Sequence, residues 1–448
     1  MIREHCGVVA VRGKDAVKIA YEALKLLQHR GQESAGIAFV KRGKIYIEKG
    51  LGLVEEALRE SIVNEESEAA IGHVRYSTTG QSSIVEAQPI SSNELALAFN
   101  GNITNYFELD IEAKTDTEFI LHFLESRKEK SIISRLIEFS KVSDGSFSIV
   151  ILTREGEIIG FRDPRGFRPL SVGKVGNSII IASEDSVIRQ LGGEEVRDVL
   201  PGEILMIKGN DMLSIRVKSS YSISTCAFEY IYFSRPDTKI DGISVYLARV
   251  RLGEILAENH PANADIVTYV PDSSRPIAIG FSRKSKLPLE EAIFKTFISK
   301  RSFIMPNQDK RLSMIEEKFG IVADVVYDKR IVLIDDSIVR GNTLRKIIAR
   351  LRDAGAKEIH VRIGSPMIRY PCYMGIDFPT RHELIAYNRN EKEIANILGA
   401  DSLEYLTIDE LIKGIGRKDL CLACFSGNYP LSKSYDISLL ESVFSRGK

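Results

Sequence analysis

A thiol lies close to the start of the chain, at a position where it could act as a nucleophile. Cys6 is followed by a glycine and an apolar run that predicts a β-strand. A thiol that attacks an amide also needs a base and donors for the oxyanion. Removal of residues 1–5 would free the α-amine of Cys6. A free α-amine has a reference pKa of about 7.7 to 8.0, so it could serve as the base. Taken alone, such a cysteine is more often a small buried apolar residue.

Four short motifs follow Cys6 at the ends of predicted strands or the starts of predicted helices. They are QHRGQESAG (28–36), GHVRYST (72–78), FNGN (99–102) and TDTE (115–118). In this order and spacing they resemble the glutaminase domain of the N-terminal-nucleophile amidotransferases. That resemblance covers residues 6–225 and implies an αββα sandwich, with two stacked antiparallel sheets between helical layers and glutamine as the substrate.

The resemblance also implies roles for five further residues. The Asn100 side chain and the Gly101 backbone N–H would form the oxyanion hole. Arg75 would hold the α-carboxylate of glutamine, because its planar fork can donate two parallel hydrogen bonds. Asp116 would hold the α-ammonium group, and Arg30 is a further substrate-binding candidate. Seen singly, these charged residues would read as a salt-bridge partner, a helix N-cap and a loop stabiliser.

A second constellation lies in IVLIDDSIVRGNT (331–343), which predicts a strand, an acidic pair, a glycine-containing turn and a helix. Such a turn aims backbone N–H groups and the positive end of a helix at one place, which suits a phosphate. Adjacent carboxylates at the end of a buried strand are costly unless they meet a metal ion or hydroxyl groups. An acidic strand end before a helix cap can also occur in any doubly wound protein.

The segment resembles the 5-phosphoribosyl-1-pyrophosphate (PRPP) signature of type I phosphoribosyltransferases. The resemblance implies PRPP as a substrate, with the binding residues Asp335, Asp336, Ser337, Arg340, Gly341 and Thr343. The loop VPDSS (270–274) resembles the family's pyrophosphate and magnesium loop, so Ser273 joins both aspartates as an expected Mg²⁺ ligand. The loop at 297–306 is shorter than is usual in the family, and Arg301 is its candidate for closing over PRPP.

Four further cysteines lie in the second half: Cys226, Cys372, Cys421 and Cys424. Their number suits a tetrahedral or cubane site, and spacing alone leaves Zn²⁺, an iron–sulfur cluster and unligated thiols open. The segments CAFEYIYFSRPD (226–237), PCYMGID (371–377) and CLACF (421–425) resemble the glutamine PRPP amidotransferases that carry a [4Fe–4S] cluster and a propeptide. All four would be cluster ligands, and residues 1–5 would be the propeptide.

The predicted elements that position these residues fall into two fold classes: α+β in the first half of the chain and α/β in the second. Strands are predicted at 6–11, 34–40, 44–50, 71–78, 95–101, 146–153 and 157–164, with helices at 16–29 and 118–126. Later, continuous apolar strands at 266–272, 330–337 and 358–364 with a helix at 343–355 predict a mainly parallel sheet. The boundary is placed at the hydrophilic stretch 215–225, giving a glutaminase domain (6–225) and a phosphoribosyltransferase domain (226–448).

Composition excludes several classes of protein. The 448 residues are 44% hydrophobic and 27% charged, which is ordinary for a globular protein. Equal numbers of basic and acidic residues, 61 each, indicate neither a nucleic-acid nor a membrane partner. With no apolar run of roughly 18 residues and no export signal, we expect a cytoplasmic protein whose odd number of cysteines forms no disulfide framework.

Taken together, the two halves resemble the glutamine PRPP amidotransferase family over nearly the whole chain. That resemblance implies transfer of glutamine nitrogen to PRPP at the start of purine synthesis, inhibition by purine nucleotides and a homo-oligomer, a tetramer by resemblance. A related glucosamine-phosphate synthase would keep the glutaminase but lacks the acidic-pair signature. A PRPP-sensing regulator on the same fold would need no nucleophile, whereas Cys6 is present.

Overall fold

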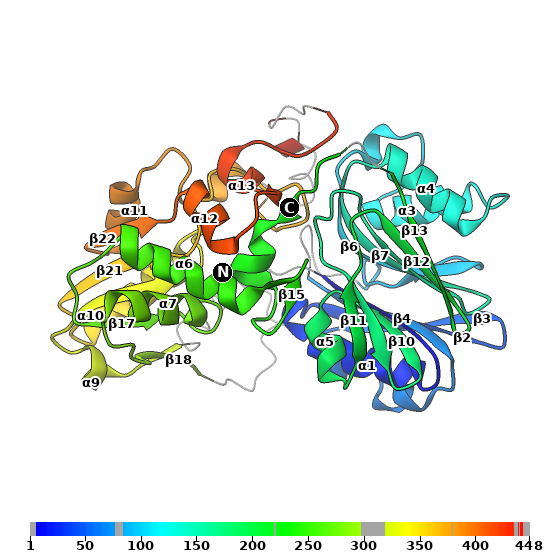
Figure 1. Ribbon diagram of the computed structural model, residues 1–448, viewed down its shortest axis with the longest axis horizontal. Coiled ribbons are helices and arrows are strands. Elements are labelled where there is room, and N and C mark those ends of the chain that lie inside the picture. Colours follow the sequence, from blue (N-terminus) through cyan, green and yellow to red (C-terminus); the bar gives the residue numbers. More distant parts are fainter. Residues whose placement is uncertain are drawn as a thin grey trace.

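A computed structural model describes residues 6–76, 84–218, 221–296, 319–378 and 380–433, together with Ser438, Leu440 and Glu441. The chain forms two halves that lie side by side (Figure 1). We call them the N-terminal half, which extends to residue 218, and the C-terminal half, which starts at residue 221.

Two antiparallel sheets form the centre of the N-terminal half. The first has seven strands in the order β11 (Glu194–Asp198), β9 (Ser171–Val175), β10 (Ser178–Ala182), β1 (Gly7–Arg12), β4 (Ala69–Arg75), β2 (Ser34–Lys41) and β3 (Lys44–Leu51). The second has six, in the order β13 (Asp211–Arg216), β12 (Glu203–Lys208), β8 (Ile158–Arg162), β7 (Gly145–Thr153), β6 (Leu95–Ile103) and β5 (Ile90–Ser91).

Helices cover the outer face of each sheet. The first sheet packs against α1 (Ala16–Leu26), α2 (Val54–Ala57) and α5 (Asp185–Gln190), and the second against α3 (Asp116–Glu125) and α4 (Ile132–Val142). Apolar side chains that alternate along the strands fill the space between the sheets, for example Val8 and Ala10 of β1. The predicted αββα sandwich is therefore confirmed (Figure 1).

The helix predicted at 16–29 is shorter than expected. The α-helix ends at Leu26 and a 3₁₀ turn, Gln28–Arg30, follows. The chain then turns at Gly31, where a Cβ atom would lie 2.7 Å from the backbone of Arg75. This close approach brings the QHRG motif against the end of β4.

A four-stranded parallel sheet is the core of the C-terminal half. Its order is β17 (Ile266–Tyr269), β20 (Arg330–Asp335), β21 (Glu358–Ile363) and β22 (Ser402–Tyr405). One face packs on α6 (Val245–Asn259), α7 (Arg275–Ser285) and α12 (Ile408–Ile415), and the other on α9 (Ala323–Val326), α10 (Asn342–Asp353) and α11 (Glu391–Leu398). Both faces are covered, and the central strand β20 is apolar from Ile331 to Ile334, as the sequence predicts. The strand β21 alternates polar with apolar residues (EIHVRI), so it is not the continuous apolar run that the sequence analysis expects.

Short elements join the two halves and surround the parallel sheet. These are β14 (Thr225–Cys226) paired with β23 (Leu420–Cys421), β15 (Lys239–Ile240) with β16 (Ile243–Ser244), β18 (Ile293–Lys295) with β19 (Phe319–Ile321), the π-helical turn Glu229–Phe233 and α13 (Ala423–Ser426). Strand β13 ends the second antiparallel sheet, and the next paired strand, β14, belongs to the C-terminal half. None of the helices within the described ranges is both long and apolar enough to cross a membrane.

Candidate active sites

Cys6 lies directly before β1, at the edge where β1 pairs with β4. Since Gly7 is opposite Val74 in the register, Cys6 comes next to the end of β4, and its Sγ is 4.0 Å from the carbonyl oxygen of Tyr76. Burial raises the pKa of the Cys6 thiol, while the nearby charges of Arg75 and Arg30 act to lower it. Thiolate formation at Cys6 therefore needs a base that takes the proton.

The two expected oxyanion residues lie on β6, which packs against β1 and β4 across the sandwich. Asn100 is 1% exposed, and neither its side-chain oxygen nor its side-chain nitrogen has a hydrogen-bond partner among the described residues. Gly101 has φ +154°, and a Cβ atom there would lie 2.0 Å from the carbonyl oxygen of Ser146. Only glycine fits at position 101. The buried side-chain amide of the preceding residue, Asn100, remains available to donate a hydrogen bond.

Arg75 and Asp116 both lie close enough to Cys6 for their charges to affect its pKa. Arg75 ends β4 and donates to Glu86 at 2.6 Å. Asp116 is the first residue of α3, where Thr115 provides the N-cap, so the N-cap alternative for Asp116 is wrong. Burial raises the pKa of Asp116 to about 6, against a hydrogen bond of 3.3 Å from the Ile103 N–H.

Arg30 is the centre of a buried charge network between the halves. Its guanidinium donates to Glu184 at 2.6 Å and to Glu229 at 2.8 Å, and all three side chains are fully buried. Its Nε also donates to the carbonyl oxygen of Cys6 at 3.3 Å. Burial alone would lower the pKa of Arg30, but the two carboxylates raise it above its usual value. The structure thus commits this guanidinium to protein partners.

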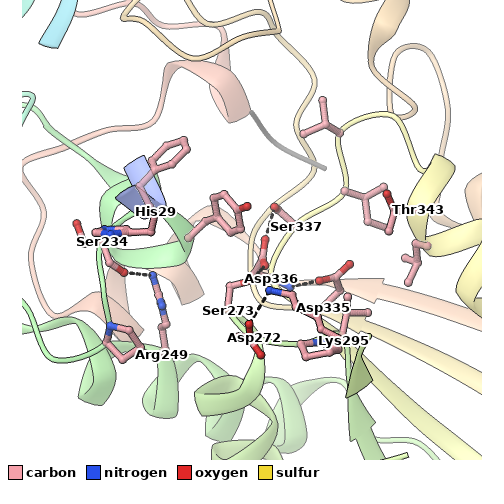
Figure 2. A pocket seen from close by; sticks show the side chains of 18 of the residues that line it. His29, Ser234, Arg249, Asp272, Ser273, Lys295, Asp335, Asp336, Ser337 and Thr343 are labelled. Atoms are coloured by element: carbon pink, nitrogen blue, oxygen red, sulfur yellow. Dashed lines mark hydrogen bonds and ion pairs between the residues drawn. The ribbon is translucent and has the colours of Figure 1, made fainter. Parts of the chain in front are cut away.

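A second site opens at the carboxyl ends of the parallel strands. A cavity of about 270 Å³ is lined by Ser273, Asp335, Asp336, Ser337, Gly341 and Thr343, among others. Ser273 follows β17, Asp335 ends β20 and Asp336 and Ser337 come directly after it, while Thr343 lies in the first turn of α10 (Figure 2). The structure therefore brings together six of the residues predicted to meet PRPP and magnesium.

The acidic pair carries unfavourable like charges. Burial raises the pKa of Asp335 well above its usual value, and the charge of Asp336 raises it further. Burial also raises the pKa of Asp336, although hydroxyl donors at Ser273 (2.5 Å) and Ser337 (2.6 Å) oppose this. The carboxylate oxygens of Asp335 and Asp336 and the hydroxyl oxygen of Ser273 fit a magnesium ion. A divalent cation would relieve the repulsion between the two carboxylates.

The turn after the acidic pair forms the start of α10. Gly341 is its N-cap with φ 75°, and no side chain caps the first turn, so the helical N–H groups remain available to a phosphate. A Cβ atom at Gly341 would lie 2.5 Å from Ile385. Arg340 does not line the cavity and forms an ion pair with Glu383. Arg301 and the loop 297–306 lie outside the described residues.

Several residues of this cavity were not predicted from the sequence. Lys295 reaches it and pairs with Asp272 at 2.5 Å. Arg249 lies 1% exposed beneath it and donates to the carbonyl oxygen of Ser234 at 2.9 Å. His29 enters from the N-terminal half and contacts Glu184 of the buried network at 2.8 Å (Figure 2). The first half therefore contributes to the second site.

The four later cysteines gather beneath the junction of the halves. Parallel pairing of β14 with β23 sets Cys226 opposite Cys421. Burial raises the pKa of Cys372 to about 11, and it raises that of Cys424, where the charges of the other three thiols add to it. Burial also raises the pKa of Cys226, although nearby Arg168 opposes this. Across the described parts of the chain, no three His, Cys, Asp or Glu side chains converge as on a single metal ion.

The two sites together define a class: a glutamine amidotransferase joined to a phosphoribosyltransferase. A family profile described as a glutamine amidotransferase domain matches residues 73–190. The amidophosphoribosyltransferase of Methanocaldococcus jannaschii is 41% identical, with 96% of this chain and 98% of that protein covered. The enzyme of the same name from Bacillus subtilis is 40% identical, with 99% and 97% covered.

Solved structures agree with these matches. The glutamine PRPP amidotransferase of B. subtilis, complexed with ADP and GMP, superposes with a TM-score of 0.88 at 40% identity, covering 96% of this chain and 98% of that one. A structure described as the allosteric regulatory enzyme of purine biosynthesis gives a TM-score of 0.90 at 40% identity, with 98% and 99% covered. This chain therefore belongs to the amidophosphoribosyltransferase family, the enzymes of the first step of purine biosynthesis.

Proposed function

We propose that the protein takes ammonia from glutamine at Cys6 and transfers it to C1 of PRPP, giving 5-phosphoribosylamine, pyrophosphate and glutamate. The observation that carries this proposal is the network around Arg30. Its guanidinium contacts the backbone of Cys6, and its partner Glu184 contacts His29, which lines the cavity at the carboxyl ends of the parallel strands. We call this cavity the PRPP cavity. A hydrogen-bonded network with Arg30 and Glu184 at its buried centre thus connects the two sites.

In the first site, removal of residues 1–5, which lie outside the described ranges, would free the α-amine of Cys6. That amine takes the thiol proton, and the sulfur attacks the amide carbon of glutamine. Asn100 and the Gly101 N–H stabilise the oxyanion, ammonia leaves with the proton, and water then releases glutamate from the thioester. Arg75 holds the α-carboxylate after exchanging its contact with Glu86, and Asp116 holds the α-ammonium group. Arg30 positions Cys6 and does not bind glutamine directly.

In the second site, Ser273, Asp335 and Asp336 would hold Mg²⁺, and the ion would supply positive charge next to the departing pyrophosphate. The ribose hydroxyls meet the acidic pair, and the first N–H groups of α10 receive the 5-phosphate with Ser337, Gly341 and Thr343. Ammonia bonds to C1 as the bond from C1 to the pyrophosphate oxygen breaks. A passage closed to water keeps ammonia unprotonated and therefore nucleophilic.

The cysteines Cys226, Cys372, Cys421 and Cys424 fit a [4Fe–4S] cluster. Three of the four cysteines are buried, and four neighbouring thiolates would repel one another unless cations joined them. A [4Fe–4S] cluster would supply those cations. Zinc would draw the sulfurs onto one ion with bonds of about 2.3 Å, a convergence that the described side chains do not have. Iron and sulfide in equal amounts in anaerobically purified protein would support this assignment, whereas stoichiometric zinc would overturn it.

Regulation follows a relative in this proposal. The B. subtilis enzyme has been described in a complex with ADP and GMP, so we propose that purine nucleotides inhibit this protein as well. We also propose a homo-oligomer in the cytoplasm and a domain boundary after residue 225.

The decisive assay measures glutamate and pyrophosphate in the same reaction. With glutamine, PRPP and magnesium all saturating, equal amounts of glutamate and pyrophosphate support the proposed function. Glutamate without pyrophosphate at saturating PRPP and magnesium would contradict it.

A further inference from the structure

A turn of the C-terminal half packs directly on the strands that carry the oxyanion residues. The Asn102 Nδ2 on β6 donates to the carbonyl oxygen of Tyr373 at 2.8 Å. The Ser146 hydroxyl on β7 donates to the carbonyl oxygen of Met374 at 2.9 Å. Asn102 and Ser146 are paired opposite each other in the β6–β7 ladder, so the turn binds both strands at the same register position.

This register position follows Gly101 by one residue along β6. The same turn continues to Gly375, which has φ +98°, and a Cβ atom there would lie 3.1 Å from the carbonyl oxygen of Gly101. The backbone of the turn thus rests against the peptide that follows the expected oxyanion donor. Gly101 has φ +154°, a conformation that side-chain-bearing residues rarely adopt. Because a glycine backbone has much conformational freedom, the groups packed around Gly101 set the orientation of its peptide groups.

The turn is itself buried and hydrogen-bonded. Tyr373 and Met374 are 1% and 2% exposed. The carbonyl oxygen of Met374 accepts a second hydrogen bond from Arg168, whose guanidinium also pairs with Glu229 at 3.5 Å. On the other side, the Met374 N–H donates to the Cys372 Sγ at 3.4 Å. A buried turn with several hydrogen bonds can fix the position of a neighbouring strand.

We propose that residues 373–375 position the backbone N–H of Gly101, so that the C-terminal half completes the oxyanion hole of the N-terminal half. Asn102 and Ser146 are positioning residues in this scheme and touch no substrate. The inference rests on the proposed function, because it requires glutamine hydrolysis at Cys6. It predicts that a looser turn weakens stabilisation of the transition state and leaves glutamine binding intact.

Asn102→Ala and Ser146→Ala test this proposal, each by removing one donor to the turn. We expect kcat for glutamine hydrolysis to fall about tenfold, as for loss of one ordinary hydrogen bond, with KM for glutamine within about twofold of wild type. The rate of Cys6 alkylation by iodoacetamide and the ammonia-dependent reaction should stay unchanged. A general loss of structure would lower all of these together.

Asn105→Ala is the matched control. Asn105 is also buried and donates to the carbonyl oxygen of Val142 at 2.8 Å, within its own half. The Asn105→Ala variant should be less stable than the wild type but should not show the selective fall in kcat for glutamine hydrolysis. Wild-type kcat in both Asn102→Ala and Ser146→Ala would overturn the proposal, as would an equal fall in the ammonia-dependent reaction.

Gly375→Ala provides an independent test that removes no donor. The added methyl group presses on the carbonyl oxygen of Gly101, so glutamine-dependent kcat should fall while ammonia-dependent turnover persists. An unchanged kcat would contradict the proposal. If Cys6→Ala abolishes glutamine use while these variants behave as wild type, only this inference fails, whereas glutamine use by Cys6→Ala would remove the proposed function itself.

Discussion

The two sites are built on opposite electrostatic plans. Around Cys6 the charges are matched, because Arg30 meets Glu184 and Glu229, and Arg75 meets Glu86. In the PRPP cavity two adjacent carboxylates repel each other, and both have raised pKa values. The charges of the first site are thus paired within the protein, whereas we propose that a cation arriving with the substrate completes the second site.

Removing divalent cations should have the largest effect and should separate the sites. With EDTA, pyrophosphate release should fall about a thousandfold with either nitrogen donor, since the cation supplies several kcal/mol of charge stabilisation. Glutamine hydrolysis measured without PRPP should persist, and excess magnesium should restore the transfer. Equal loss of both activities would show that the sites do not differ in this way.

Breaking a matched pair should destabilise the protein. Glu229→Gln leaves part of the Arg30 charge uncompensated in a fully buried place, so the free energy of unfolding should drop by about 3–5 kcal/mol. Glu258→Gln is the control, because its ion pair with Lys284 is half-exposed and should contribute less than about 1 kcal/mol. Urea titrations of both variants measure the difference. Equal values would mean that burial of the network does not matter.

Asn100→Ala should affect the first site only. The unpaired Asn100 amide is free to donate to an oxyanion, so kcat for glutamine should fall about a hundredfold to a thousandfold. Ammonia-dependent transfer should keep its wild-type rate in the same preparation. Comparable losses with the two donors would assign Asn100 to folding.

A pH profile should show a smaller effect at Asp116. Its pKa is raised to about 6, so the carboxylate is charged at pH 7 and becomes neutral as the pH falls through 6. The neutral form cannot pair with an ammonium group, and KM for glutamine should therefore rise about tenfold between pH 7 and pH 5. Asp116→Asn should give a high KM that is constant over this range. A flat profile in the wild type would contradict the assigned role.

Local patterns made the second site predictable to a large extent. The apolar strand, acidic pair, glycine turn and amphipathic helix around Asp335 are contiguous, and the structure reproduces them as β20 and α10. The helices α11 and α12 could have been predicted in the same way, because Asn390 with Glu393 and Thr407 with Glu410 form capping boxes.

The buried network could not be predicted by such patterns. Arg30 is 154 residues from Glu184 and 199 residues from Glu229, and a lone acidic residue gives no local sign of burial. The place of His29 in the PRPP cavity depends in the same way on how the two halves dock. Contacts of this kind arise from tertiary packing, which periodicity and motif spacing do not encode.

The central claim is that Cys6 alone provides the route from glutamine to PRPP. The most direct test compares Cys6→Ala with the wild type for pyrophosphate release from PRPP, once with glutamine and once with ammonia. We predict that the variant loses the glutamine reaction and keeps the ammonia reaction. Glutamine-dependent release by Cys6→Ala at the wild-type rate would contradict the account.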